Sequence, residues 1–117
     1  MIKFVQCMRR HPDLTPAEFR QQWEDYKPAW EAFAALMNAV RVSFSTTLAI
    51  EANQQLSLNR GTEEPYDGVV ETWIEDAHGL EELLATPVVE AAQRDLFTRQ
   101  HAFLDLGRCC FFFTADD

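Results

Sequence analysis

The stretch 66–76, YDGVVETWIED, predicts the central strand of a β-sheet. Its first three residues favour a turn, and most of those that follow are β-branched or aromatic strand formers. Because side chains alternate along a strand, Val70 and Ile74 share one apolar face, while Glu71 lies between large apolar neighbours on the other. One dry face and one mixed face indicate a sheet that is covered on one side and encloses something on the other.

Length and composition indicate one folded domain over residues 1–117. Hydrophobic residues make up 47% of the chain, enough for a core, and no apolar run approaches the roughly 18 residues that span a bilayer. A formal net charge of −9 argues against nucleic acid and anionic membranes as partners. The opening MIKF leads directly into a strand pattern, so no signal peptide is expected. Three cysteines are too few for a disulfide framework or a zinc site, and a cytoplasmic location is expected.

The first helix has a clear start signal. Thr15 at the N-cap, Pro16 at the first position and Glu18 at the third predict a capping box. Apolar residues then recur every three or four positions, which predicts one buried helix face. This stripe consists of Phe19, Trp23, Tyr26, Trp30, Phe33 and Met37. Pro28 is expected to kink or split the helix near Lys27, because it removes a backbone hydrogen bond.

Similar patterns place the other elements. Strands are predicted over 2–9, 41–48, 66–76 and 107–114. Asp76 is expected to cap a short helix, and Thr86-Pro87 is expected to start a longer one that runs to about Arg99. The segments 49–65 and 101–106 are expected to be irregular connections.

The element order is therefore β-α-β-β-α-β, which predicts an α+β, ferredoxin-like fold. In this fold both helices lie on one face of a four-stranded antiparallel sheet, with the first and third strands in the middle. The set expected to face the helices is Val5, Cys7, Val42, Phe44, Val70, Ile74, Cys109, Phe111 and Phe113. The opposite set is Phe4, Gln6, Met8, Ser43, Ser45, Glu71, Trp73, Cys110 and Phe112.

The second set predicts an assembly. Leaving its large apolar side chains in water would forgo about 1.5–3 kcal/mol for each one. The resulting patch would also be larger than monomers usually expose. A second copy packed sheet to sheet would cover it, so a homodimer through the sheet faces is expected.

Taken together, the motifs resemble those of the EthD family, one branch of the dimeric α+β barrel superfamily. The matching pieces are the opening MIKFVQCMRR, the helix start 14–19 with Trp23, the strand 66–74, and 103–105 followed by Arg108. The resemblance covers most of the chain except 49–65. It implies a single EthD-like α+β barrel domain and a homodimer whose two sheets enclose a barrel-like interior, with one mostly apolar pocket per subunit. We expect this pocket between the sheet and the helices.

The resemblance also implies a range of activities. EthD-like proteins are associated with ether degradation and with decarboxylation or dehydration of aromatic polyketides, generally without metal or organic cofactor. Relatives in the superfamily include cofactor-free monooxygenases, lactone isomerases and haem-binding proteins. This chain departs from the family at Lys27, which stands where a histidine is common, and the glycine that usually follows is missing. A lysine does not exchange protons near neutral pH as a histidine does, so a mechanism built on that histidine is in doubt.

Glu71 is the candidate catalytic acid/base, because a carboxylate among bulky apolar residues suits proton transfer in a pocket. Its alternative role is structural, as a hydrogen-bond partner of Gln6 or an ion-pair partner of Arg9 or Arg41. The candidate substrate-binding residues are Phe4, Gln6, Met8, Tyr26, Lys27, Trp30, Ser43, Ser45, Trp73, His101, Cys110 and Phe112. No pair of histidines has metal-ligand spacing, so no metal and no cofactor is predicted.

Three functions stay open at this point. The first is a cofactor-free enzyme acting on a hydrophobic, aromatic small molecule. The second is a dimer that binds such a molecule without catalysis. The third, haem or oxygen chemistry, is disfavoured because the first helix offers no histidine as a haem ligand.

Overall fold

The computed structural model describes residues 1–116. Along the chain its elements are β1 (Ile2–Met8), α1 (Pro16–Leu36), β2 (Arg41–Thr46), α2 (Glu51–Arg60), β3 (Gly68–Ile74), α3 (Leu80–Leu84), α4 (Pro87–Phe103), the 3-10 turn η1 (Leu106–Arg108) and β4 (Cys110–Ala115).

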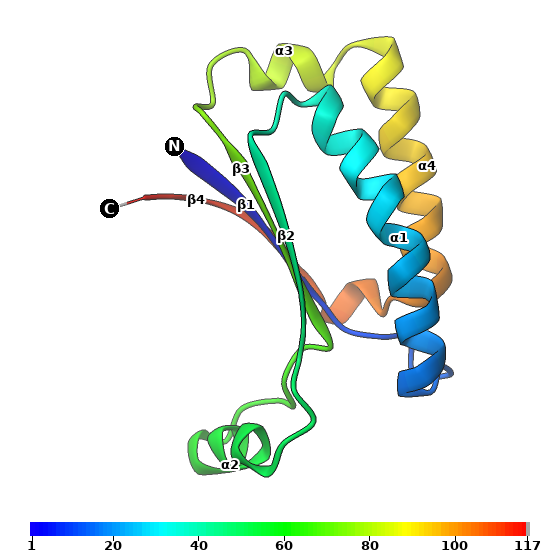
Figure 1. Ribbon diagram of the computed structural model, residues 1–117, viewed down its shortest axis with the longest axis vertical. Coiled ribbons are helices and arrows are strands. Elements are labelled where there is room, and N and C mark those ends of the chain that lie inside the picture. Colours follow the sequence, from blue (N-terminus) through cyan, green and yellow to red (C-terminus); the bar gives the residue numbers. More distant parts are fainter. Residues whose placement is uncertain (117) are drawn as a thin grey trace.

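The strands form one antiparallel sheet in the order β2-β3-β1-β4. Helices α1 and α4 lie side by side against one face of it (Figure 1). The predicted ferredoxin-like fold, with β1 and β3 in the middle, is confirmed. The opposite face is not covered by α1, α3 or α4 (Figure 1), and it is called the open face below. By strand register it carries Lys3, Val5, Cys7, Arg41, Ser43, Ser45, Val69, Glu71, Trp73, Cys110, Phe112 and Thr114.

Helix α1 begins as its sequence predicts. The backbone N–H of Glu18 donates to Thr15 Oγ1 at 3.1 Å, and the Thr15 N–H donates to Glu18 Oε1 at 3.0 Å. The predicted split at Pro28 is wrong, because α1 continues through this residue to Leu36. Pro28 lies on the exposed side, while Tyr26 and Trp30 beside it are buried, so packing holds the helix on both sides of the lost hydrogen bond.

Three expected boundaries are corrected by the structure. The segment 49–65 is not irregular, since it contains α2, which ends at Gly61 in the left-handed conformation with φ 65°. Helix α4 extends to Phe103, through much of the expected linker. Asp76 accepts a turn hydrogen bond from the His78 N–H at 2.8 Å and does not cap α3, whose N-cap is Gly79.

The core lies between the sheet and the two long helices. The aromatic stripe of α1 is buried there as predicted, with Trp23 and Tyr26 at 1% and 2% exposure. Strand β3 begins at Gly68 beneath the Trp23 indole, where an added Cβ would lie 2.6 Å from the ring. Only glycine permits this close approach of strand and helix.

The predicted faces of β1 are reversed in the structure. Phe4, Gln6 and Met8 face the helices, and Gln6 and Met8 are fully buried. Val5 and Cys7 lie instead on the open face, where Val5 pairs directly with Glu71. The error has a physical cause: polar Gln6 was expected outside the core, but a hydrogen bond from a helix side chain satisfies its oxygen inside. Cys109, also expected on the helix side of the sheet, precedes β4, and its Sγ accepts from the Arg9 N–H at 3.2 Å.

Candidate functional site

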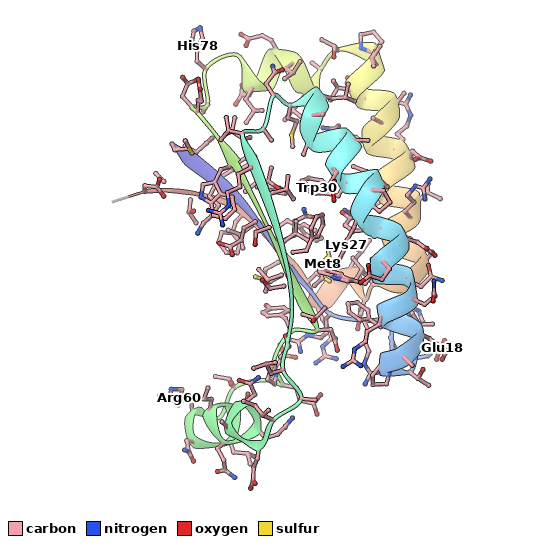
Figure 2. The ribbon with its side chains drawn as sticks, viewed as in Figure 1. Met8, Glu18, Lys27, Trp30, Arg60 and His78 are labelled. Atoms are coloured by element: carbon pink, nitrogen blue, oxygen red, sulfur yellow. The ribbon has the colours of Figure 1, made fainter. Side chains whose placement is uncertain are left out.

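The sheet divides the predicted site residues into two groups. Those between the sheet and the helices are Phe4, Gln6, Met8, Tyr26 and Trp30. Figure 2 shows Met8 on the sheet and Trp30 on α1, with both residues in the space between the two layers. Those on the open face are Ser43, Ser45, Glu71, Trp73, Cys110 and Phe112. The two groups therefore cannot wall one pocket within a single chain.

A hydrogen-bonded chain crosses the interior from α4 to the sheet. Gln100 Nε2 donates to the Tyr26 hydroxyl at 3.0 Å, and that hydroxyl donates to Gln6 Oε1 at 3.0 Å. Burial raises the pKa of Tyr26, with the Gln100 hydrogen bond opposing the shift. The tyrosine is therefore a neutral donor at physiological pH. Nearby, Trp30 Nε1 donates to Thr72 Oγ1 at 2.8 Å.

The amide nitrogen of Gln6 ends this chain without a partner. Gln6 is fully buried, and within residues 1–116 its Nε2 makes no hydrogen bond. A buried donor left unsatisfied costs about 1–3 kcal/mol. Such an atom in an otherwise satisfied core indicates a position where a hydrogen-bond acceptor belongs.

The surroundings of Gln6 are aromatic. The ring of Phe4 lies 5.8 Å from that of Trp30 and 4.8 Å from that of Phe113, measured between centroids. A surface hollow of about 290 Å³ between α1 and α4 reaches Tyr26 and Phe103 from outside. The remaining residues that line this hollow are Gln22, Asp25, Thr98, Arg99 and Ala102. The hollow meets the interior polar chain at Tyr26, and Gln6 is not among its lining residues.

On the open face, Glu71 is held in an ion pair. Its Oε2 lies 2.8 Å from Lys3 Nζ, and both side chains are about one-quarter to one-third exposed (27% and 30%). Lys3 and Arg41 also lie over the Trp73 ring, at 5.5 Å and 4.6 Å from its centroid. Ser43 is the residue directly opposite Glu71 on β2. The predicted acid/base group thus has a cation beside it and lies on the far side of the sheet from Gln6.

Two cysteines face each other beside this group. Cys7 on β1 pairs with Cys110 on β4. The Tyr66 hydroxyl lies 3.0 Å from Cys110 Sγ, and this contact raises the pKa of Tyr66. All three cysteines of the chain are free thiols.

Two predicted residues lie apart from both groups. Lys27 Nζ pairs with Glu24 Oε1 at 3.0 Å and lies 5.8 Å from the Phe44 ring centroid, near the β2 edge. His101 is exposed on α4, where its ring packs edge-on against Phe97 at 4.5 Å. Neither residue reaches the interior polar chain. The described residues contain no group of three or more His, Cys, Asp or Glu side chains arranged to hold a metal ion.

Three residues of these groups were not predicted from the sequence: Thr72 and Gln100 in the interior, and Lys3 on the open face. The contacts of Thr72 and Gln100 join residues far apart in the chain, so spacing within one segment gives no signal for them. Lys3 could have been found from the register, because it lies opposite Trp73 and diagonal to Glu71.

Comparison with known proteins shows the family of the chain and a shared fold. The model of the EthD domain family matches residues 11–105. A dimeric protein of unknown function and ferredoxin-like fold from Bacteroides fragilis is similar, with a TM-score of 0.62 and 10% identity over 98% of this chain and 95% of that chain. A dimeric ferredoxin-like protein of unknown function from Thermobifida fusca gives a TM-score of 0.61 and 17% identity, over 98% and 90%.

SnoaB, a cofactor-independent oxygenase from Streptomyces nogalater, shares the fold with a TM-score of 0.54 and 15% identity, over 99% of this chain and 92% of that chain. No curated protein matches the sequence. None of the helices within residues 1–116 has the length and apolar character needed to cross a membrane.

Proposed function

Because this chain belongs to the EthD family, we propose that it is a homodimeric, cofactor-free enzyme acting on a hydrophobic, aromatic small molecule. The substrate binds between the sheet and the helices. The observation that carries this proposal is the unpaired amide nitrogen of Gln6, fully buried within an aromatic core. It supplies two N–H donors to an acceptor that the protein itself does not provide.

The interior groups favour stabilisation of negative charge on a substrate oxygen. The Gln6 amide nitrogen is the donor, and the Tyr26 hydroxyl, neutral because burial raises its pKa, gives its single proton to Gln6 Oε1 and so holds that amide in place. Fixed donors in a dry site stabilise a developing oxyanion more strongly than water does. An aromatic ketone or phenol that readily forms an enolate or phenolate is the substrate class that needs such donors most. SnoaB, a cofactor-independent oxygenase, is an example of this fold hosting chemistry without a cofactor.

The homodimer forms through the open faces of two sheets. That face carries Trp73 and the half-exposed Phe112, which a second sheet would cover. The relatives from Bacteroides fragilis and Thermobifida fusca are dimeric ferredoxin-like proteins, which supports the same assembly here. Free Cys7, Cys109 and Cys110 fit a reducing cytoplasm.

Ligand binding without turnover is the second candidate function. The Lys3–Glu71 ion pair favours it, because it leaves the predicted acid/base carboxylate occupied and separated from Gln6 by the sheet. If Glu71 does transfer protons, it serves the interior of the dimer. A substrate that binds beside Gln6, on the helix side of the sheet, is then out of its reach.

The experiment compares Gln6→Met with the matched variant Gln21→Leu, an exposed position on α1. Methionine keeps the volume of residue 6 and removes the donors, and the Gln100 amide can turn its oxygen toward Tyr26. Binding and turnover of aromatic ketones such as anthrone are followed by tryptophan fluorescence and absorbance. We expect Gln6→Met to weaken binding by about 10-fold or more and Gln21→Leu to leave it unchanged. Equal binding by both variants would show that Gln6 does not contact the ligand.

A further inference from the structure

The segment 47–67 projects from the end of the sheet as an arm, with α2 at its tip. Figure 1 shows α2 beyond the ends of β2 and β3, on the side of the sheet opposite α1 and α4. None of the residues of α2 is buried. Four aliphatic side chains of the arm are largely exposed: Leu48 at 66%, Ile50 at 47%, Leu56 at 52% and Leu58 at 72%.

The burial pattern along α2 is the reverse of that in a helix that packs on its own domain, because the apolar side chains are the exposed ones. Its two least exposed residues are polar, Asn53 and Ser57, one turn apart. A short helix with no buried apolar face gains little from its own chain. The exposed leucines therefore indicate a partner outside the chain.

The base of the arm is nevertheless fixed to the sheet. The Thr47 N–H donates to the backbone carbonyl oxygen of Asp67 at 3.1 Å, and the Asp67 N–H donates to the backbone carbonyl oxygen of Met8 at 2.8 Å. Arg9 Nη1 donates to the backbone carbonyl oxygen of Glu64 at 2.7 Å. Arg108 Nη2 forms an ion pair with Glu63 Oε1 at 2.9 Å. An arm held in this way loses little freedom on docking.

A hollow of about 600 Å³ lies mostly within the arm. Its lining includes Leu56 of α2, Tyr66 near the end of the arm, and Arg9, which lies outside the arm after β1. Tyr66 also contacts Cys110 of the open face, so hollow and open face form one continuous surface.

We infer that the arm docks on a second copy of this chain, which covers the four aliphatic side chains and closes the hollow. The inference rests on the homodimer in the proposed function and extends it to a segment outside the sheet. A standard interface uses about 20–30 residues on each side. The open face alone supplies fewer, and the arm adjoins it, so a second copy is the occupant that this surface fits.

The test uses the full-length protein and adds negative charge at two pairs of positions on α2. The double variant Leu56→Asp/Leu58→Asp is compared with Gln55→Asp/Asn59→Asp, which places the same charge at exposed polar positions. The dimer dissociation constant is measured by sedimentation over a dilution series. We expect the leucine variant to raise it about 100-fold or more and the control to change it less than about threefold.

A second measurement is independent of any variant. Hydrogen exchange of the α2 amides is followed in the unmodified protein above and below the dimer dissociation constant, and protection is expected only above it. If the wild type is dimeric, two results would overturn the inference. One is a leucine variant with the same dimer dissociation constant as wild type, and the other is α2 hydrogen exchange that does not change with protein concentration; the arm would then bind a different partner. A wild-type protein that is monomeric throughout instead defeats the homodimer of the proposed function.

Discussion

A glutamine side chain in a core brings two donor hydrogens and one acceptor oxygen that all require partners. At Gln6 the protein satisfies the oxygen, through Tyr26, and leaves the nitrogen unpaired. Replacing this residue with an apolar one would avoid the cost, so its presence calls for a reason. A ligand acceptor supplies one, and this makes Gln6 the residue on which the functional proposal depends.

Tyr26, the partner of Gln6, carries a pH-dependent prediction for the stability of the fold. Because burial raises the pKa of Tyr26, the folded state holds the phenolic proton more tightly than the unfolded state does. Its contribution to stability is fully present below about pH 10 and is lost as the pH rises further. Urea unfolding from pH 8 upward should show a steeper alkaline loss for wild type than for Tyr26→Phe.

At neutral pH the same variant should be less stable by about 1–3 kcal/mol, since Gln6 and Gln100 both lose a partner. Equal alkaline slopes in wild type and variant would show that the hydroxyl is not buried as described.

The Lys3–Glu71 pair gives a second prediction at this scale. If the dimer encloses the open face, each partner is left as an unpaired charge when the other is removed. A double-mutant cycle with Lys3→Met and Glu71→Gln, read by unfolding of the dimer, should therefore give a coupling energy above about 1 kcal/mol. A smaller coupling is typical of an exposed pair and would contradict enclosure.

Among the elements, β3 and α1 depend on each other most closely at Gly68. A Cβ there would lie 2.6 Å from the Trp23 ring, whereas a Cβ on Gly107 would meet nothing within 4 Å. Gly68→Ala should therefore cost about 1–3 kcal/mol of unfolding free energy, because strand and helix must separate. Gly107→Ala is the control, and thermal unfolding of the two variants checks the difference. Equal melting temperatures would mean that the contact yields without cost.

Sequence patterns predict the elements whose burial is periodic. The capping box and aromatic stripe of α1 fix that helix, and alternation places Glu71 and Trp73 on the open face. The same reasoning fails for α2, because a helix that buries nothing has no apolar period to detect. It fails for β1 as well, because the partner that makes Gln6 acceptable in the core lies on a helix. Such a pairing between distant segments leaves no trace in the spacing of one strand.

For the whole molecule, the sheet separates two surfaces with different roles in this account. The helix side encloses the polar chain of Gln6, Tyr26 and Gln100, and the open face with the arm is the surface that we propose meets a second copy. The sequence predicted both roles but assigned their residues to one pocket. Only the strand register shows that they lie on opposite sides.

The assembly carries its own prediction. At micromolar concentration, light scattering should give about twice the 13.5 kDa of one chain. Phe112→Asp, on the open face, should dissociate the dimer, because it places a charge in the apolar contact. Phe97→Asp is the matched control, since Phe97 is more exposed than Phe112 (56% against 44%) but lies on α4. A monomeric wild type, or dissociation by both variants alike, would contradict a dimer formed through the sheet.

The claim that a ligand acceptor binds the Gln6 amide can be checked on the side-chain resonances of that residue. In a titration of the labelled protein with an aromatic ketone such as anthrone, we predict a shift of the Gln6 side-chain N–H pair, with the exposed Gln21 pair unmoved as internal reference. The claim is contradicted if the Gln6 pair stays fixed while the Trp73 indole of the open face responds, because the ligand would then bind on the other side of the sheet.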